Sequence, residues 1–369
     1  MKTAHTVLFQ DSKQMDSIPP NSVDLMVTSP PYPMIEMWDE TFSTQNSSIQ
    51  DALKRAWSAE AFELMHKVLD PVWDEAYRVL KEGGIACINI GDATRTIDGD
   101  FTLYSNHSRI LRYLLSIGFN TLPNILWRKQ TNAPNKFMGS GMLPAGAYVT
   151  LEHEFILIVR KGSKREFRKA KEKTKRRESA FFWEERNVWF SDVWMDIKGA
   201  IQGLENRNTR LRSGAYPFEV AHRLINMFSV KGDIVLDPFL GTGTTTAAAM
   251  ATARNSIGFE IDPGLRDTIH SIKRNIVDFA NEYIRNRITR HLDFIENRVK
   301  TQRPLKHTNN PYGFSIMTSQ ETELVLNELE NVKDAGDNTF EVSYSEEPQA
   351  MFCKDWSRSG SSFAPPGVK

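Results

Sequence analysis

A stiff tetrapeptide, Ser29-Pro30-Pro31-Tyr32, directly follows a short apolar run at Val23–Thr28 that predicts a buried strand. Its two prolines restrict the backbone and remove two amide donors, so the loop presents a carbonyl, a hydroxyl and an aromatic ring in a fixed arrangement. This set suits a planar base with an exocyclic amine. The Ser29 hydroxyl and the Pro30 carbonyl can accept the amine protons, and Tyr32 can stack on the ring. The plainer interpretation is a rigid turn with a packing tyrosine.

A glycine-rich loop at Asp237–Thr245 (DPFLGTGTT) forms a second candidate site. It lies between an expected strand at Ile234–Asp237 and an expected helix at Thr244–Ala253, so a ligand can approach its backbone beside free N–H groups. Glu260 ends the next expected strand, where a carboxylate can accept hydrogen bonds from ribose hydroxyls. No Gly-Lys-Ser/Thr follows, which excludes a P-loop, and Thr246 replaces the third glycine of a dinucleotide fingerprint. The pattern favours a nucleoside site over a structural turn with a surface glutamate.

The elements around these loops alternate between strand and helix, which predicts a mostly parallel α/β sheet. Both loops follow strands, at the carboxyl ends where open α/β sheets bind ligands. We expect the stretch at 266–300 to pack on the domain as one or two amphipathic helices; the alternative is a dimer contact. Further strands are expected at Ile85–Ile90, Glu154–Val159 and Ser256–Glu260, and helices at 58–82, 106–117 and Ala215–Val230.

Together, the two motifs resemble the amino-methylating DNA methyltransferases that use S-adenosyl-L-methionine. Their order, with the tetrapeptide before the glycine loop, is similar to the permuted β group of that family. The resemblance covers roughly residues 7–262 and includes the segments LKEGG, INIGD and YPFEVAHRLI. It implies an α/β, Rossmann-like methyltransferase fold with circularly permuted motif order and an inserted target-recognition region.

The resemblance also implies roles for individual residues. The tetrapeptide Ser29, Pro30, Pro31 and Tyr32 would be catalytic. Asp11 would approach the adenine of the cofactor. The rest of the cofactor would be bound by Asp237, Pro238, Phe239, Gly241, Gly243 and Thr244 around its methionine part, by Glu260 on the ribose, and by Pro217 and Phe218 closing the pocket.

The chemistry that these residues permit is direct methyl transfer to an exocyclic amine. Carbon-5 methylation of cytosine needs a thiolate, usually in a Pro-Cys pair, and neither Cys87 nor Cys353 stands in one. A sulfonium methyl is already electrophilic, so positioning is the main task and no metal is expected. A base within a duplex must be flipped out to reach Tyr32. By the family pattern, Ser29 favours N4 of cytosine over N6 of adenine, and RNA is a less favoured substrate.

The formal net charge of zero conceals an uneven distribution. Residues 161–177 hold ten Lys/Arg and two Glu (+8), whereas residues 320–347 hold nine Asp/Glu and one Lys (−8). The β group places its target-recognition region between the two motifs, so we expect the basic block to contact DNA phosphates. The alternative is a solvated charged helix. The residues proposed to bind DNA are Lys164, Arg165, Arg168, Arg176, Arg177, Arg207, Arg210 and Arg212, the last three with Gln202, Asn206 and Asn208 as candidates for base-edge contacts.

Several nearby residues have two interpretations. Trp189 and Trp194 suit core packing as well as base contacts. His153 and Glu154 have the types of an acid–base pair, but we expect a structural role because the transfer needs no such pair.

Composition and charge complete the sequence-based expectations. The chain is 40% hydrophobic and 25% charged, with no apolar run long enough for a membrane helix. Two distant cysteines exclude a disulfide scaffold and suit the prokaryotic cytoplasm, where we expect association with the nucleoid. The expected partners are double-stranded DNA, a cognate restriction endonuclease and a second copy of the chain. We divide the chain into a catalytic half (1–160), a target-recognition region (161–212), a cofactor-binding half (213–265), a helical extension (266–302) and a loop-like acidic segment outside the catalytic domain (303–369).

Overall fold

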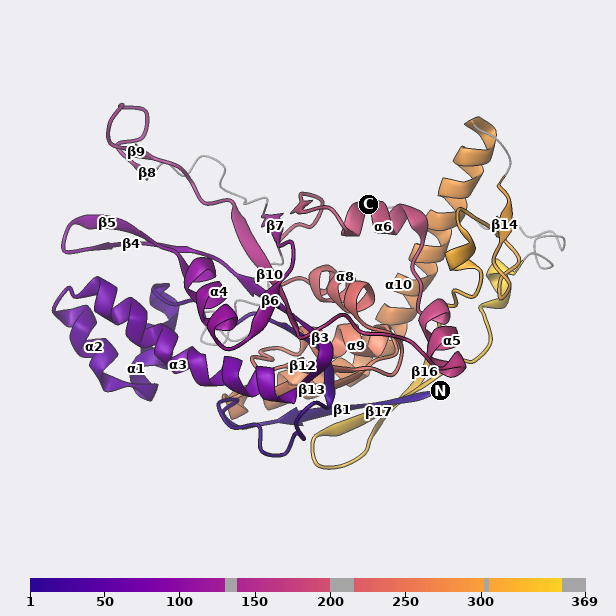
Figure 1. Ribbon diagram of the computed structural model, residues 1–369, viewed down its shortest axis with the longest axis horizontal. Helices are drawn as coiled ribbons and strands as arrows, with labels where there is room; N and C mark the ends of the chain where they lie inside the picture. Colours follow the sequence, from indigo (N-terminus) through magenta and orange to yellow (C-terminus); the bar gives the residue numbers. More distant parts are fainter. Residues whose placement is uncertain (130–137, 200–215, 302–304, 354–369) are drawn as a thin grey trace.

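The computed structural model describes residues 1–129, 138–199, 216–301 and 305–353. One large sheet, flanked by helices, dominates these residues (Figure 1). Five neighbouring strands, from β3 to β1 in the order below, are parallel, and antiparallel strands extend the sheet on both sides. In spatial order the strands are β11 (Val193–Trp194), β7 (Ile125–Arg128), β10 (His153–Lys161), β3 (Leu80–Ile90), β2 (Val23–Thr28), β12 (Ile234–Asp237), β13 (Asn255–Phe259), β1 (Lys2–Leu8), β17 (Thr339–Tyr344) and β16 (Leu329–Asp334), with β6 (Phe119–Thr121) also on β10. The prediction of a mostly parallel α/β sheet is confirmed.

Helices cover both faces of this sheet, and β2 shows how the sequence directs them there. All six residues of β2 are buried, as expected for a strand between two helical layers. Met26 packs with α3 and α4, whereas Leu25 and Val27 pack with α8 and α9 on the other face, because successive side chains of a strand alternate. The helices are α1 (Asp39–Gln45), α2 (Ser47–Lys54), α3 (Ser58–Val79), α4 (Asn106–Ser116), α5 (Ala170–Glu178), α6 (Trp183–Trp189), α8 (Phe218–Phe228), α9 (Thr244–Ala251) and α10 (Arg266–Thr301).

Short elements complete the described residues. Three two-stranded hairpins lie outside the main sheet: β4 (Ala93–Ile97) with β5 (Asp100–Tyr104), β8 (Met138–Gly139) with β9 (Ala147–Tyr148), and β14 (His307–Thr308) with β15 (Ser315–Ile316). Single 3₁₀ turns occur at η1 (Glu36–Trp38), η2 (Pro263–Leu265), η3 (Ser319–Glu321) and η4 (Ala350–Phe352). Among the described helices, none combines the length and the apolar character that crossing a bilayer requires.

Two predicted helices differ in detail. The helix expected at 58–82 is α3, which contains Pro71 in its interior and ends three residues earlier than expected, at Val79. Gly83 and Gly84 belong to β3, which begins at Leu80. The 266–300 stretch is one helix, α10, whose buried residues pack in a core with residues of α9, β1, β16 and β17. The expected packing of this stretch on the domain is confirmed.

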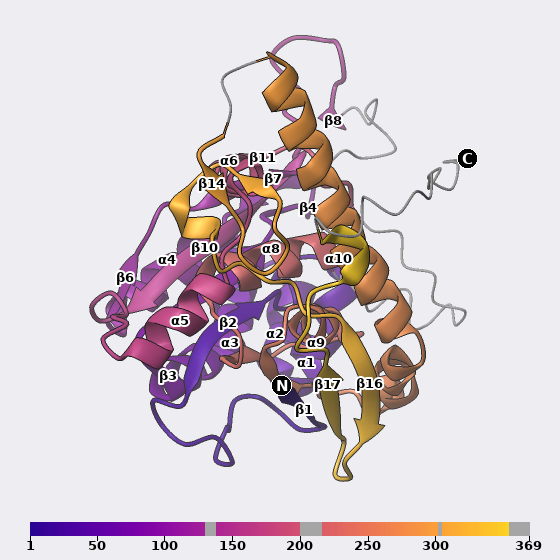
Figure 2. The same ribbon diagram turned by 90° about the vertical axis from the view of Figure 1, so that its right-hand side faces the viewer.

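The acidic C-terminal segment is not loop-like, and this expectation was wrong. Residues 2–6 of β1 pair antiparallel with β17, and β16 pairs with β17, so the segment adds two strands to the main sheet (Figure 2). Phe340, Val342 and Tyr344 alternate inward along β17 and are buried, while the carboxylates face outward. The acidic residues of this hairpin, Glu330, Asp334 and Glu341, therefore lie on an edge of the domain's own sheet, whereas Glu321 is buried in the turn η3.

Candidate active site

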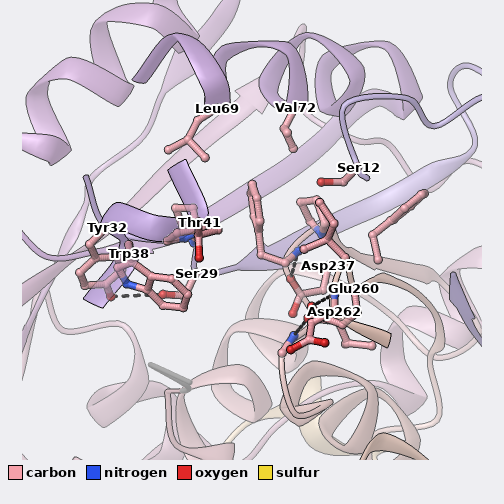
Figure 3. Close-up of a pocket in the computed structure, with 18 of the residues that line it drawn as sticks. Ser12, Ser29, Tyr32, Trp38, Thr41, Leu69, Val72, Asp237, Glu260 and Asp262 are labelled. Carbon is pink, nitrogen blue, oxygen red and sulfur yellow. Dashed lines mark hydrogen bonds between the residues drawn. The ribbon is translucent and has the colours of Figure 1, made fainter. Parts of the chain in front are cut away.

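A cavity of about 780 Å³ opens at the carboxyl ends of β2, β12 and β13, beside α1 and α3. Its two ends carry different groups. Figure 3 shows Ser29, Tyr32 and Trp38 at one end and Asp237, Glu260 and Asp262 at the other. The volume lies within the range of small-molecule pockets. The fold thus brings the two predicted loops together across one cavity.

The two loops are joined directly by a buried hydrogen bond. Thr28, the last residue of β2, donates from its hydroxyl to Asp237 Oδ1 at 2.6 Å. The backbone N–H of Phe239 donates to the same oxygen at 3.0 Å, and the Thr245 hydroxyl donates to Oδ2. Burial raises the pKa of Asp237, and these donors favour its ionised form. Asp237 therefore ties the end of β2 to the start of α9 and sets the shape of the glycine loop.

The glycine loop is shaped for close approach by a ligand. Gly241 has φ of +57°, and a Cβ placed on it would meet no atom within 4 Å. Gly243 has φ of +90° at the N-cap of α9, where a Cβ would lie 2.4 Å from the side chain of Ile272. Both positions adopt the left-handed conformation that favours glycine. Gly241 thus leaves open space at the cavity, whereas Gly243 permits close packing against α10.

Glu260 follows β13 and closes the second end of the cavity. The backbone N–H groups of Gly241 and Asp262 donate to its two carboxylate oxygens, each at 2.8 Å. Burial nevertheless raises the pKa of Glu260 to about 7. The carboxylate is held in place with remaining lone pairs for donors on a ligand.

The phenol of Tyr32 is held by a polar network at the first end of the cavity. Its hydroxyl donates to Glu154 Oε2 at 3.0 Å and accepts a hydrogen bond from Asn89 Nδ2 at 2.8 Å. Asn89 also donates to Glu154 Oε2 at 2.6 Å, and Lys129 forms an ion pair with Oε1. Ser29 Oγ lies 3.2 Å from the Tyr32 hydroxyl. Burial and the neighbouring carboxylate raise the pKa of Tyr32 well above its usual value, so it remains a neutral donor.

Most of the predicted site residues line this cavity, but three do not. Pro217 caps α8, and Phe218 packs against Phe279 and Tyr283 of α10. Neither of these two lines the cavity, whereas the preceding Tyr216 does. Gly243 faces α10, as described above. The predicted residues that do line it are Asp11, Ser29, Pro30, Pro31, Tyr32, Asp237, Pro238, Phe239, Gly241, Thr244 and Glu260.

Asn89, Lys129 and Glu154 are site residues that the sequence-based prediction missed. Glu154 was expected to have a structural role, but it contacts Tyr32 and lines the cavity. The reason is topological. β10 runs antiparallel to β3, so the first residues of β10 lie beside the last residues of β3 and near the Ser29–Tyr32 loop. A polar His-Glu pair at the start of an apolar strand was the available signal.

The basic block lies at the opposite edge of the sheet from the tetrapeptide. Arg165 donates two hydrogen bonds to Asp233, at 2.6 and 3.0 Å, and lies 3.5 Å from Asp24. Asp24 and Asp233 stand at the starts of β2 and β12, whereas Ser29 and the glycine loop follow their ends. Lys164, Arg165, Arg176 and Arg177 line a cavity there, and Arg168 pairs with Glu166. Arg207, Arg210 and Arg212, like Gln202, Asn206 and Asn208, lie outside the described residues.

The two tryptophans of the recognition region belong to the core. The exposed fractions of Trp189 and Trp194 are 4% and 1%. The indole N–H of Trp194 donates to the carbonyl of Trp189 at 3.0 Å. Of the two interpretations, core packing is the one that the structure supports.

The fold and the cavity define a Rossmann-like methyltransferase, and comparison with known proteins identifies the family. The chain matches the family described as DNA methylase, of the N6/N4 type, over residues 23–271. It is 48% identical to the Type II methyltransferase M.MthZI of Methanothermobacter thermautotrophicus, over 94% of this chain and 96% of that protein. It is 50% identical to M.MjaI of Methanocaldococcus jannaschii, over 76% of this chain and 97% of that protein. The chain belongs to this DNA methylase family.

A solved structure supports the same assignment. TTHA0409 of Thermus thermophilus, in complex with S-adenosyl-L-methionine, superimposes with a TM-score of 0.56 and 29% identity, covering 74% of this chain and 95% of that one. Our chain is thus an S-adenosyl-L-methionine-dependent DNA methyltransferase. The recognition from the two sequence motifs is confirmed.

The residues of the cavity fit this cofactor. Glu260 can accept hydrogen bonds from a ribose, and the open space at Gly241 admits a ligand against the backbone. The sulfonium is a cation, and carboxylates outnumber lysines in the lining, which favours a positive ligand. The charged lining residues are Asp11, Glu40, Glu154, Asp237, Glu260 and Asp262 with Lys13 and Lys129.

Proposed function

We propose that the enzyme methylates the exocyclic N4 of cytosine in a specific duplex sequence, as part of a restriction–modification system. Ser29 at the head of the tetrapeptide carries the choice of base, because the family members that the sequence resembles mostly modify cytosine N4 when serine stands there. Two of the relatives are named Type II methyltransferases, which supports the proposed role and a cognate endonuclease.

The reaction needs an amine that is aimed and freed from conjugation. Bound S-adenosyl-L-methionine supplies an electrophilic methyl group on its sulfonium. The Ser29 hydroxyl and the Pro30 carbonyl accept hydrogen bonds from the two amine N–H groups of the flipped base. These hydrogen bonds turn the nitrogen lone pair toward the methyl group. Tyr32 stacks on the base, and Glu154 and Asn89 fix the direction of its phenol. Each of these residues acts by position, and the one proton that the methylated amine must lose is released to solvent.

The cysteines support this choice of chemistry over carbon-5 methylation. Cys87 is fully buried in the core at β3, and burial raises the pKa of its thiol. A protonated thiol behind the sheet cannot attack a base in the cavity. Cys353 lies in the C-terminal segment beside Pro311, outside the lining of the cavity.

Product analysis tests the proposal. The full chain is incubated with S-adenosyl-L-methionine labelled on its methyl group and with duplex DNA from an unmodified genome. The DNA is digested to nucleosides, and the product is identified by mass and retention time. N4-methylcytosine supports the proposal, whereas N6-methyladenine overturns it and assigns the second activity of the family. Label found only in added RNA, or in no nucleic acid, overturns DNA methylation at this site.

A further inference from the structure

A second large cavity, of about 1040 Å³, lies at the amino-terminal edge of the parallel strands. It is bordered by α5, α6 and the turn at Ser319–Glu321, and we call it the basic groove. Seven Lys and Arg side chains but only two carboxylates line it. We propose that the basic groove binds the phosphate backbone of duplex DNA that flanks the methylated site. This proposal rests on the proposed function, because the groove would be a second binding surface for the DNA molecule that is methylated at Tyr32.

The groove is separate from the active site. Asp24, at the start of β2, lines the groove, and Ser29, just after the end of β2, lines the active-site cavity. The five steps between them span about 16 Å at the rise of a strand. Because duplex DNA rises about 3.4 Å per base pair, this corresponds to about five base pairs. Figure 1 places α5, at the groove, and α1, at the active site, on opposite sides of the molecule. DNA has to run around the outside of the domain, so its path is longer than this straight-line separation. A duplex of about 10 base pairs centred on Tyr32 extends only about 17 Å to each side and stops short of the groove, whereas one of about 40 base pairs can bend toward it.

The groove carries positive charge that the protein does not neutralise. Lys164, Lys173 and Arg177 are exposed, and within the described ranges none of them forms an ion pair with a carboxylate. Lys173 and Arg177 lie one turn apart on α5, where like charges repel and weaken the helix. A polyanion relieves this repulsion and releases its own counterions on binding. The charge thus favours a phosphate backbone as the occupant.

The floor of the groove is arranged before any ligand binds. Two guanidinium groups lie over the ring of Phe167, that of Arg165 at 4.7 Å and that of Arg176 at 4.8 Å from the ring centroid. Arg165 is further held by Asp233. Stacked guanidinium groups lose less freedom on binding than free side chains do, which favours phosphate recognition. Arg176 therefore presents a preorganised positive charge in the same groove as the exposed cations Lys164, Lys173 and Arg177.

A charge-neutral variant tests the proposal in the full chain. Lys164, Lys173 and Arg177 are all changed to Gln, which leaves the Phe167 stack and the Arg165 pair intact. The matched control changes Arg274, Lys306 and Lys333 to Gln, because these are exposed cations that line neither cavity. Affinity is measured by fluorescence anisotropy for mixed-sequence duplexes of about 10 and about 40 base pairs, lengths set by the 3.4 Å rise, over a series of salt concentrations.

We expect the groove variant to bind the long duplex roughly tenfold more weakly. The slope of log affinity against log salt concentration should become shallower by the amount that corresponds to about two to three lost phosphate contacts. Binding of the short duplex, and the behaviour of the control, stay at the wild-type level. Unchanged binding of the long duplex overturns the proposal. Equal weakening for both lengths also overturns it, because the groove cations then bind any duplex in solution and not specifically the DNA that flanks a duplex held at the active site. A loss confined to single-stranded RNA assigns the groove to another nucleic acid.

Methyl transfer to genomic DNA by the wild-type chain is measured in parallel. A product other than N4-methylcytosine contradicts the proposed function while the length dependence still decides the groove. Conversely, N4-methylcytosine formation with no length dependence leaves the function standing and removes the groove.

Discussion

Buried carboxylates at the two ends of the parallel strands have different kinds of partner. In this comparison, the amino-terminal edge means the side of the sheet where the parallel strands begin, and the carboxyl edge means the side where they end. At the amino-terminal ends of the strands, buried Asp24 pairs with Lys81 at 2.8 Å and buried Asp233 pairs with Arg165 at 2.6 Å. At the carboxyl ends of the strands, Asp237 and Glu260 are buried but held by hydroxyl and N–H donors, and no Lys or Arg among the described residues forms an ion pair with either. Neutral donors position a carboxylate while leaving its charge for a ligand. The same strands thus build a negative cavity that suits a sulfonium and, at their other ends, a positive groove that suits phosphate.

Removing the ring of Tyr32 should have the largest effect on turnover of the proposed substitutions. We expect Tyr32→Ala to lower kcat by roughly 100-fold or more, because an unstacked base is misplaced relative to the methyl group. Tyr32→Phe keeps the ring and loses only the hydroxyl that Glu154 and Asn89 hold, so its loss is smaller. Cofactor affinity, measured by calorimetry, should be unchanged in both. A fully active Tyr32→Ala enzyme contradicts the stacking role.

Glu154 tests whether the network behind Tyr32 matters for turnover. Glu154→Gln keeps the shape of the side chain but cannot balance Lys129, and the lost charge-assisted contacts predict a kcat roughly tenfold lower. Glu152→Gln is the matched control, since Glu152 pairs with Arg128 on the surface and does not line the cavity. Single-turnover rates with saturating cofactor separate this effect from binding. Equal rates for the two variants show that Glu154 is only structural.

Glu260 predicts a pH dependence of cofactor binding. Its pKa is raised to about 7 by burial, and ribose hydroxyls donate to the ionised carboxylate. Affinity should therefore rise with pH up to about 7 and level off above it, changing by at most about tenfold per pH unit below the pKa. The stability of the ligand-free protein changes in the opposite sense, because a raised carboxyl pKa favours the folded state at low pH and the benefit is lost as pH rises through 7.

Glu260→Gln provides the control for this titration. The variant should bind the cofactor more weakly, with an affinity that does not vary with pH between about 5 and 8, a window around the raised pKa of Glu260. Calorimetry over this range compares the two curves. A pH dependence that survives the substitution assigns the titration to another group.

Local patterns predicted the parts of the fold that depend on neighbours in sequence. Ile234–Asp237 is a strand with the predicted bounds, and the two loops meet at one cavity, because each motif contains its own strand and its turn. The carboxyl-edge rule for parallel sheets then placed Ser29 and Glu260 correctly.

Pairings between distant segments could not be predicted in this way. The chain enters β10 antiparallel to β3, and only that register brings Glu154 to Tyr32 and sends Lys161 and the basic block to the other edge. The pairing of β17 with β1 joins residues more than 330 positions apart and has no local signature beyond a weak alternation. A charge count along the chain showed where the basic block lies in sequence but not at which edge of the sheet.

The smallest expected effect is that of Arg165→Gln, at the amino-terminal edge of the sheet. Arg165→Gln leaves Asp24 and Asp233 with less compensation, and Arg165 is about a third exposed, so we expect a loss of about 1–2 kcal/mol in the free energy of unfolding. Arg177→Gln removes the same charge from the same groove without breaking an ion pair, and its stability should equal that of the wild type. Denaturant titration measures both. Neither variant should change kcat at saturating DNA, because the amino-terminal edge holds the fold and the flanking DNA but does not contact the reacting atoms. A lower kcat for Arg165→Gln would mean that the two edges are coupled through β2 and β12.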